Sequence, residues 1–158
     1  MDIRVGFGFD VHRLGEGHTL VLGGQTIPNH VGTIGHSDAD VLLHSICDAL
    51  LGALALGDIG HHFPDTDESF KNIDSKILLT RTHDIISDRG WSVINLDCTL
   101  VLEKPKIAPY VLQMRETISK LLSIEVDRVS IKATTNERVG YIGREEGTAA
   151  YATVLLMK

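Results

Sequence analysis

The chain has 158 residues, of which 43% are hydrophobic and 23% are charged, and its formal net charge is −6. This length fits a single domain that buries about two-thirds of the surface of its unfolded chain. The negative charge argues against non-specific binding to nucleic acid, and no apolar run is long enough to cross a membrane, so we expect neither partner.

Residues 3–12 predict the first strand, because apolar side chains alternate there with glycine or polar side chains. The period of two gives this strand one apolar face. Asp10 and His12 project together from the other face, near the end of the strand, where two glycines leave space beside them.

Gly23-Gly24 stands between two short apolar segments, residues 19–22 and 25–27, and predicts a two-residue turn. We therefore expect a short hairpin after the first strand. Residues 28–33 are interpreted as a loop.

A long apolar segment, Ala39 to Leu56, predicts a helix that is buried on nearly every side. Only Gly52 weakens it, at a cost of about 1 kcal/mol relative to Ala. We expect Ser37 or Asp38 to cap the first turn, because short oxygen side chains accept hydrogen bonds from the free N–H groups there.

Asp40, His44 and Asp48 stand four residues apart in this segment, so they form one polar stripe along an otherwise apolar helix. Either carboxylate is placed to orient one ring nitrogen of His44, as carboxylates do around metal-bound histidines. For Asp40 the alternative is simple complementarity to the positive end of the helix dipole.

The remainder of the chain predicts two more helices and three more strands. In order, we expect an irregular loop at 57–67, a helix at 72–89, a strand at 91–102, a helix at 105–122 with Pro105 in its first turn, a strand at 129–134, a polar turn at 135–147 and a final strand at 148–157. Helices that bury one face need a sheet to lie on. The expected fold is therefore α/β (α+β), a two-layer domain with a mixed open sheet and helices on one face.

Asp10, His12 and His44 are the strongest candidates for a metal site. Two imidazoles and one carboxylate suit zinc, and three protein ligands leave a fourth position open, as in catalytic zinc sites. The three residues come from distant segments, so a hydrogen-bonded structural cluster is the alternative.

Other polar residues can also bind a substrate. His36 and Ser37 stand before the long helix, where free N–H groups favour an anion such as phosphate. Thr134, Thr135 and Glu137 follow a predicted strand and offer hydroxyls and one acid to a substrate or a hard cation. The loop at 57–67 adds further candidates or is merely solvated: Asp58, His61, His62, Asp65 and Asp67. We find no glycine-rich nucleotide fingerprint and no nucleophile motif.

Six motifs together resemble the family of 2-C-methyl-D-erythritol 2,4-cyclodiphosphate synthases. They are GFGFDVHR at 6–13, GHSDADVLLH at 35–44, GDIGHHFPDTD at 57–67, PK at 105–106, KATTNE at 132–137 and GYIGREEG at 140–147. The resemblance covers nearly the whole chain. It implies that residues 1–158 form one catalytic domain and that three copies assemble into a homotrimer with active sites between neighbouring subunits.

The resemblance also implies the site residues. Zinc falls to Asp10, His12 and His44, and magnesium or manganese to Glu137. His36 and Thr135 take the catalytic positions. The substrate-binding positions are His36, Ser37, Asp58, Gly60, Phe63 and Asp65 for the methylerythritol phosphate end, Leu102, Pro105, Lys106, Ile107, Thr134 and Thr135 for the cytidine diphosphate end, and Tyr141 and Arg144 near the trimer axis. Tyr141 stands where many members have Phe, and Leu102-Glu103-Lys104 is bulkier than the small residues often found before Pro-Lys.

The implied reaction closes a ring. The 2-phosphate of 4-diphosphocytidyl-2-C-methyl-D-erythritol 2-phosphate attacks the β-phosphorus of its own diphosphate and expels CMP, a step of non-mevalonate isoprenoid biosynthesis. An attacking group that is already an anion needs no protein nucleophile, so the enzyme bends the substrate and offsets its charge. The alternatives are a zinc-dependent phosphohydrolase and a non-catalytic binding protein for isoprenoid diphosphates.

Cys47 and Cys98 form no redox or metal motif and are expected to be buried, reduced thiols. A strand-like pattern follows Met1 at once, which leaves no room for a signal peptide. We expect a cytoplasmic protein, although a processed plastid form fits the sequence equally well.

Overall fold

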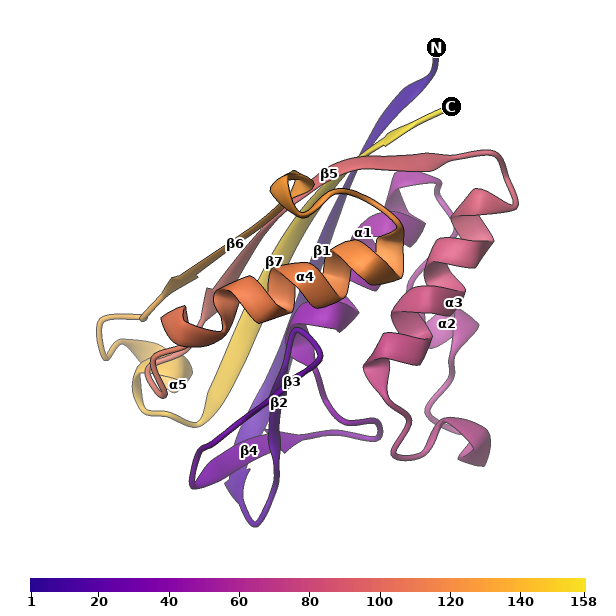
Figure 1. Ribbon diagram of the computed structural model, residues 1–158. Coiled ribbons are helices and arrows are strands. Elements are labelled where there is room, and N and C mark those ends of the chain that lie inside the picture. The colour runs from indigo at the N-terminus through magenta and orange to yellow at the C-terminus, as the bar shows by residue number, and fades with distance from the viewer.

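Five strands form one mixed sheet in the order β4-β1-β7-β5-β6 in the computed structural model, which describes residues 1–158 (Figure 1). Neighbouring strands are antiparallel except for β5 and β6, which are parallel. The strands are β1 (Ile3–Glu16), β4 (Val31–Ile34), β5 (Ser92–Val101), β6 (Val129–Thr134) and β7 (Gly147–Met157), and a separate hairpin consists of β2 (Leu20–Leu22) and β3 (Gln25–Ile27). The predicted mixed α/β architecture and the Gly23-Gly24 hairpin are confirmed.

Three long helices lie on one side of this sheet: α1 (Val41–Ala53), α3 (Ser75–Ser87) and α4 (Val111–Leu122). Helix α1 packs on β1 and β7, α4 packs on β6, and α3 contacts both other helices. Two short helices, α2 (Ile59–His62) and α5 (Gly140–Gly143), interrupt the loops, as do 3-10 turns at Glu68–Phe70, Ala108–Tyr110 and Val126–Arg128. No helix has the length and apolar character that a membrane span requires.

The glycines of β1 determine how closely α1 approaches the sheet. A Cβ atom on Gly6 would lie 1.8 Å from the carbonyl oxygen of Ala49, and one on Gly8 would lie 1.9 Å from that of Ser45. Only a residue without a side chain fits between the strand and the helix at these two positions. The side of β1 that carries Asp10 and His12 is therefore pressed against α1.

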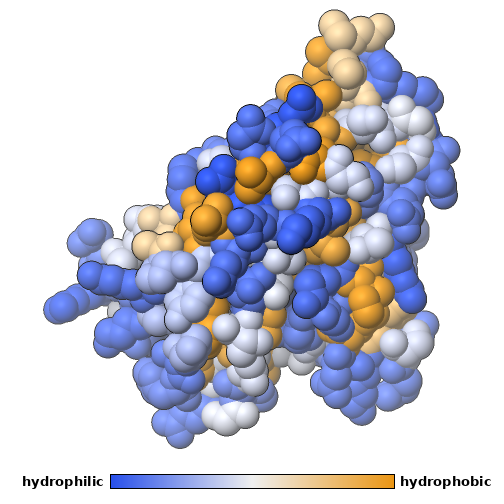
Figure 2. Space-filling view, viewed as in Figure 1, coloured by the Kyte–Doolittle hydropathy of each residue, from blue (hydrophilic) through white to orange (hydrophobic).

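The apolar side of β1 faces away from the helices and is not part of the core. Val5 is 67% exposed, Phe7 63% and Phe9 42%. Tyr151 of the neighbouring strand β7 adds to this surface, its ring centroid 5.1 Å from that of Phe9. In Figure 2 hydrophobic colour gathers where the two termini lie, at the end of this strand pair. The alternation in the sequence is that of a strand, but its apolar half forms an uncovered surface.

The long helix begins later than the sequence predicted. Its N-cap is Asp40, not Ser37 or Asp38, and the carboxylate of Asp40 accepts hydrogen bonds from the backbone N–H groups of Leu42 and Leu43. Ala39 has φ +55°, which a helix cannot continue through. The predicted helix from Ala39 to Leu56 is therefore α1, shorter at both ends.

Two further boundaries differ for identifiable reasons. The predicted helix at 105–122 starts only at Val111, because Pro109 has no N–H to donate to the carbonyl of Pro105. The loop predicted at 28–33 contains the start of β4, which pairs with the last residues of β1. Gly15 and Gly32 face each other in this pairing, so no alternating side chains mark it in the sequence.

Candidate metal centre and substrate cavities

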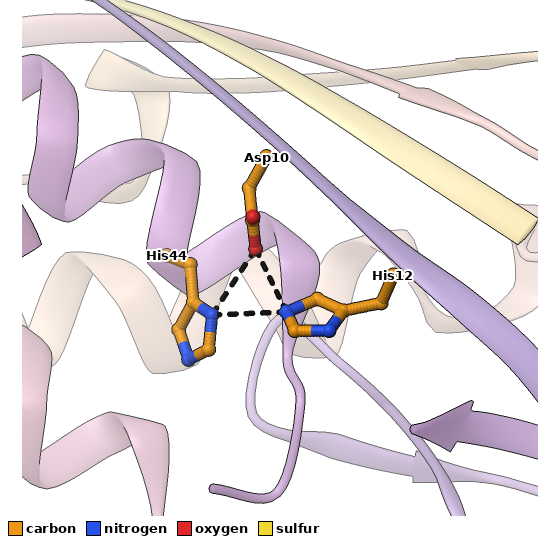
Figure 3. Close-up of side chains that lie close together, drawn as sticks. All are labelled: Asp10, His12 and His44. Atoms are coloured by element: carbon orange, nitrogen blue, oxygen red, sulfur yellow. Dashed lines mark hydrogen bonds and ion pairs between the residues drawn. The ribbon is translucent and has the colours of Figure 1, made fainter. Parts of the chain in front are cut away.

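Asp10, His12 and His44 meet at one point between β1 and α1 (Figure 3). Asp10 Oδ2 lies 3.0 Å from His12 Nε2 and 3.1 Å from His44 Nδ1, and the two nitrogens are 3.2 Å apart. A tetrahedral zinc ion with bonds of about 2.0–2.1 Å separates its ligand atoms by about 3.3 Å. The three donor atoms therefore have the spacing and chemistry of a metal site with one position left for another ligand.

Each of the two imidazoles forms a hydrogen bond through the ring nitrogen that points away from Asp10, which leaves the other ring nitrogen free to bind a metal. The Nδ1–H of His12 donates to the carbonyl oxygen of Ile34 at 3.0 Å. The Nε2–H of His44 donates to the hydroxyl of Ser75 at 2.9 Å, and that hydroxyl donates to the carboxylate of Asp38. These tautomers follow from the acceptors present, and they direct the lone pairs of His12 Nε2 and His44 Nδ1 toward Asp10.

Neither Asp40 nor Asp48 orients His44, so this expectation was wrong. The carboxylate of Asp40 is fully buried and binds four backbone N–H groups, two from the first turn of α1 and those of Gly23 at 3.0 Å and Gly24 at 2.6 Å. Asp48 accepts the N–H of Ile59 at 2.7 Å. Asp40 thus holds the β2–β3 hairpin against α1, and Asp48 holds the start of α2.

Ser75 takes the role that was expected of Asp40 or Asp48. It is fully buried at the start of α3, and Asp38 also accepts its backbone N–H at 3.0 Å. The sequence signal for it was Asp74, an N-cap residue whose side chain accepts the N–H of Lys76. The prediction of a helix beginning at residue 72 placed Ser75 inside that helix and hid this signal.

Replacing Ser75 by alanine should weaken zinc binding by up to about tenfold, because His44 Nε2 loses the nearer of its two hydroxyl partners, Ser75 at 2.9 Å, and keeps only Ser37 at 3.2 Å. Competition against a chromogenic chelator measures this affinity. Ser45→Ala is the matched control, since Ser45 is equally buried but donates to the carbonyl oxygen of Leu42 inside α1. Equal zinc affinity in Ser75→Ala and Ser45→Ala would contradict the role of Ser75.

The charges of the three residues are coupled. Burial alone would raise the pKa of Asp10, but the hydrogen bonds and charges of His12 and His44 outweigh it and lower this pKa to about 2. Burial alone would lower the pKa of His12, yet the hydrogen bond and charge of Asp10, the hydrogen bond to the Ile34 carbonyl and the charge of Asp40 together outweigh it and raise this pKa above 6.5. In the metal-free protein, a proton on His12 is therefore favoured by the Asp10 carboxylate.

Zinc affinity should consequently fall as the pH falls. A metal ion must displace the proton of His12, and because the pKa of His12 is raised above 6.5, this proton is bound at low pH and is lost only as the pH rises through the raised pKa. We expect a loss of up to about tenfold in affinity for each pH unit below the raised pKa of this residue. Chelator competition at pH 8, 7 and 6 measures it, and a constant affinity over this range would contradict the coupling.

A cavity of about 360 Å³ opens beside the three residues. Its lining includes five of the residues that the sequence suggested for substrate, His36, Ser37, Gly60, Phe63 and Asp65, and four apolar residues that it did not suggest, Ile59, Phe70, Ile73 and Leu78. The Nε2 atom of His36 is buried without a hydrogen-bond partner in the chain. A polar atom in this state favours a ligand that can satisfy it.

The start of α1 is not the anion site that the sequence suggested. The N–H groups of Leu42 and Leu43 are already bound by Asp40, and His36 lies five residues before the helix. His36 and Ser37 therefore face the cavity from a loop. This loop is held by hydrogen bonds from Asn72 N–H to His36 O and from Asp38 N–H to Ile73 O.

Some residues of the loop at 57–67 line the cavity, and others only form hydrogen bonds that stabilise the loop itself. Asp58 does not line the cavity, because it caps α2 by accepting the N–H of His61 at 2.9 Å. The Nε2–H of His62 donates to the carbonyl oxygen of Leu56. Neither His61, His62 nor Asp67 joins the metal group.

A second cavity, of about 230 Å³, lies at the ends of β5 and β6. It collects the residues suggested for the cytidine end, Leu102, Pro105, Lys106, Ile107, Thr134 and Thr135, together with Glu103, Ala108 and Ala133. Glu137 is exposed just beyond it, and its N–H donates to Thr135 Oγ1 at 3.3 Å. The two cavities share no residue and lie toward opposite edges of the sheet.

Tyr141 and Arg144 line neither cavity. Tyr141 lies on α5 with 42% of its surface exposed, and Arg144 follows that helix and forms two hydrogen bonds with Glu146, at 2.8 and 3.1 Å. Both are near the strand pair β1–β7, since β7 begins at Gly147.

Comparison with known proteins decides the family. The model of the YgbB family matches residues 3–157. The chain belongs to the YgbB family. A relative from Prosthecochloris aestuarii, called 2-C-methyl-D-erythritol 2,4-cyclodiphosphate synthase, is 58% identical over 154 residues, 98% of each chain.

Solved structures of YgbB relatives have the same fold. A bifunctional IspDF from Campylobacter jejuni matches with a TM-score of 0.94 and 43% identity over 98% of this chain and 42% of its own. A cyclodiphosphate synthase in a CDP-bound form matches with a TM-score of 0.90 and 36% identity over 98% of this chain and all of its own (100%). The YgbB fold therefore covers the whole of the metal group and both cavities.

Proposed function

We propose that this chain is a metal-dependent phosphorus–oxygen lyase that makes 2-C-methyl-D-erythritol 2,4-cyclodiphosphate and CMP from 4-diphosphocytidyl-2-C-methyl-D-erythritol 2-phosphate. One observation carries the proposal. The Asp10, His12 and His44 donors open onto a cavity in a chain that is 58% identical, over 98% of its length, to a protein called by the name of this synthase. The chemistry belongs to isoprenoid biosynthesis, and the cytoplasm is its proposed location.

The metal proposed for the three donors is zinc, because two imidazoles and one carboxylate are its usual ligands. Bound there, it would supply positive charge to a phosphate oxygen. Glu137 is proposed to hold magnesium or manganese. Its single exposed carboxylate, which forms no ion pair in the chain, suits a hard cation that takes most of its other ligands from substrate phosphates and water.

The chain's own residues then bind and bend the substrate. His36, with its buried and unpartnered Nε2, and Ser37 are proposed to contact phosphate oxygens at the metal end, with Gly60, Phe63 and Asp65 forming the methylerythritol pocket. Asp58, which caps α2 and does not line this cavity, is proposed to reach the substrate from beside it. The hydroxyl oxygen of Thr135 accepts the N–H of Glu137. The hydroxyl proton donates to no other group in the chain, so a ligand can accept it. We propose that this proton binds the diphosphate, and that His36 and Thr135 together bring the reacting phosphates into line.

The second cavity is the proposed site of the cytidine. A relative with this fold is described as a CDP-bound form. The apolar walls of Leu102, Pro105 and Ile107 can hold the base, and Lys106 and Thr134, which also line the cavity, are proposed to bind its polar edge and the phosphates.

The active form is proposed to be a homotrimer. The two cavities of one chain lie toward opposite edges of the sheet, so we propose that a single substrate fills one cavity from each of two neighbouring copies. The uncovered apolar surface of β1, continued by Tyr151, supplies a face for such contact. Tyr141 and Arg144 would lie near the axis of this assembly. Light scattering after gel filtration should give three times the chain mass.

Product analysis tests the proposed reaction. The purified protein, loaded with zinc, is mixed with the cytidyl substrate and magnesium, and phosphorus NMR follows the products. Cyclic diphosphate and CMP in equal amounts are expected. Linear phosphates would indicate a phosphohydrolase instead, and no turnover by the zinc-loaded trimer would leave only the non-catalytic binding protein.

A further inference from the structure

Glu103 has a carboxylate that the proposed reaction does not use. It lies in the turn after β5, half-buried, and its Oε1 atom accepts two backbone hydrogen bonds, from Asn136 N–H at 2.8 Å and from Arg138 N–H at 3.3 Å. It forms no ion pair. The adjacent cation, Lys104, binds Glu145 instead, with Nζ 2.9 Å from Oε1. The charge of Glu103 is therefore balanced by backbone amides of the loop that follows β6.

This loop has an unusual backbone. Glu137 has φ +51° and Arg138 has φ +61°, a left-handed conformation that side chains with a Cβ rarely adopt twice in succession. Such a conformation persists only where surrounding contacts hold it. The N–H groups on either side of Glu137 converge on one carboxylate oxygen, as the amides of a backbone nest converge on an anion.

Other contacts do not replace this anchor. Asn136 Nδ2–H donates to Val139 O at 2.7 Å and Val139 N–H donates to Asn136 O at 2.9 Å, which closes the loop on itself. Only the Glu103 carboxylate ties residues 136 and 138 to the turn on the other side of the second cavity. A carboxylate at the edge of a cavity for a polyanion repels that ligand, and the two amides bound to Glu103 offset part of this repulsion.

We propose that Glu103 is a positioning residue: by holding the amides of Asn136 and Arg138, its carboxylate directs the Glu137 side chain toward the phosphates of the nucleotide. The inference rests on the proposed function, in which Glu137 binds magnesium beside a cytidine diphosphate group. Glu103 acts on the cation through Glu137 and makes no contact with the reacting atoms.

Calorimetric titration of CDP, with and without magnesium, tests this role without turnover. In the wild-type protein, magnesium should increase CDP affinity. In Glu103→Ala this increase should shrink by about tenfold or more, as in Glu137→Gln, while CDP affinity without magnesium should not fall, because the substitution removes a negative charge from the edge of the cavity. Glu103→Gln should retain most of the increase, because its amide oxygen accepts the same two N–H groups. Glu145→Gln, which removes a carboxylate from the Lys104 pair only, should match the wild type.

The outcomes separate positioning from simple structural support. If Glu103→Ala lowers CDP affinity equally with and without magnesium, or leaves both unchanged, the proposal is wrong. It is also wrong if magnesium has no effect on CDP binding by the wild-type protein. A wild-type protein that binds CDP with magnesium but makes no cyclic product would refute the proposed reaction while leaving the role of Glu103 supported.

Discussion

His44→Ala is expected to lose the bound metal and at least about a hundredfold of activity. The variant leaves one carboxylate and one imidazole, two donors where a stable zinc site needs three or four. It also leaves Asp10 and His12 in contact, which favours the proton on His12 and so opposes metal binding further. Elemental analysis after dialysis gives the zinc content, and phosphorus NMR gives the rate.

His30→Ala is a suitable control for this variant. His30 is exposed and lines neither cavity, so its removal should leave zinc content and rate unchanged. A His44→Ala protein with one zinc per chain would contradict the ligand set, whatever its activity.

Gly8→Ala is expected to cost about 3 kcal/mol or more of the free energy of unfolding. The added Cβ would lie 1.9 Å from the carbonyl oxygen of Ser45 and 2.7 Å from the backbone nitrogen of Ala49. Both contacts are with the backbone of α1, which cannot rotate away as a side chain can, so the helix must move off the strand. Because β1 carries two of the three metal donors and α1 carries the third, zinc affinity should fall with stability.

Urea denaturation of the metal-free protein measures this cost. Gly52→Ala gives a matched comparison in the same pair of elements, since its added Cβ has no neighbour closer than Phe7 O at 3.8 Å. That variant should be more stable than the wild type by about 0.5–1 kcal/mol, because alanine favours a helix interior over glycine. A Gly8→Ala protein as stable as Gly52→Ala would contradict the close contact of α1 and β1.

The elements that the sequence predicted well are those with a strong local pattern. The alternation in residues 3–12 predicted β1, and the apolar run from Ala39 predicted α1. The same alternation does not indicate which face is buried. The glycines lie in the core because α1 needs their space, and that depends on a helix forty residues further along the chain.

Helix starts were less predictable because several residues could serve as a cap. Ser37, Asp38 and Asp40 all have short oxygen side chains, and φ +55° at Ala39 leaves only Asp40 in position. Its carboxylate also binds Gly23 and Gly24, a long-range contact with no signature in the sequence.

The three metal donors could be grouped from their residue chemistry, but the residues that hold those donors in position could not be predicted. Asp10 and His12 share a strand face, and His44 could be paired with them by its chemical type. Ser75, which orients His44, is a small polar residue with no distinctive spacing, and it is brought there by the packing of α3 on α1. Glu103 was seen only as a bulky residue before Pro105, because its partners are backbone amides in a loop after β6.

The reaction in water labelled with oxygen-18 tests the central claim most directly, which is that the substrate's own phosphate is the attacking group. Ring closure forms the new P–O–P bond from an oxygen already in the substrate, so mass spectrometry should find no label in either the cyclic diphosphate or CMP. One labelled oxygen per turnover in CMP or in a linear phosphate product would show that water attacks, and would contradict the cyclising lyase.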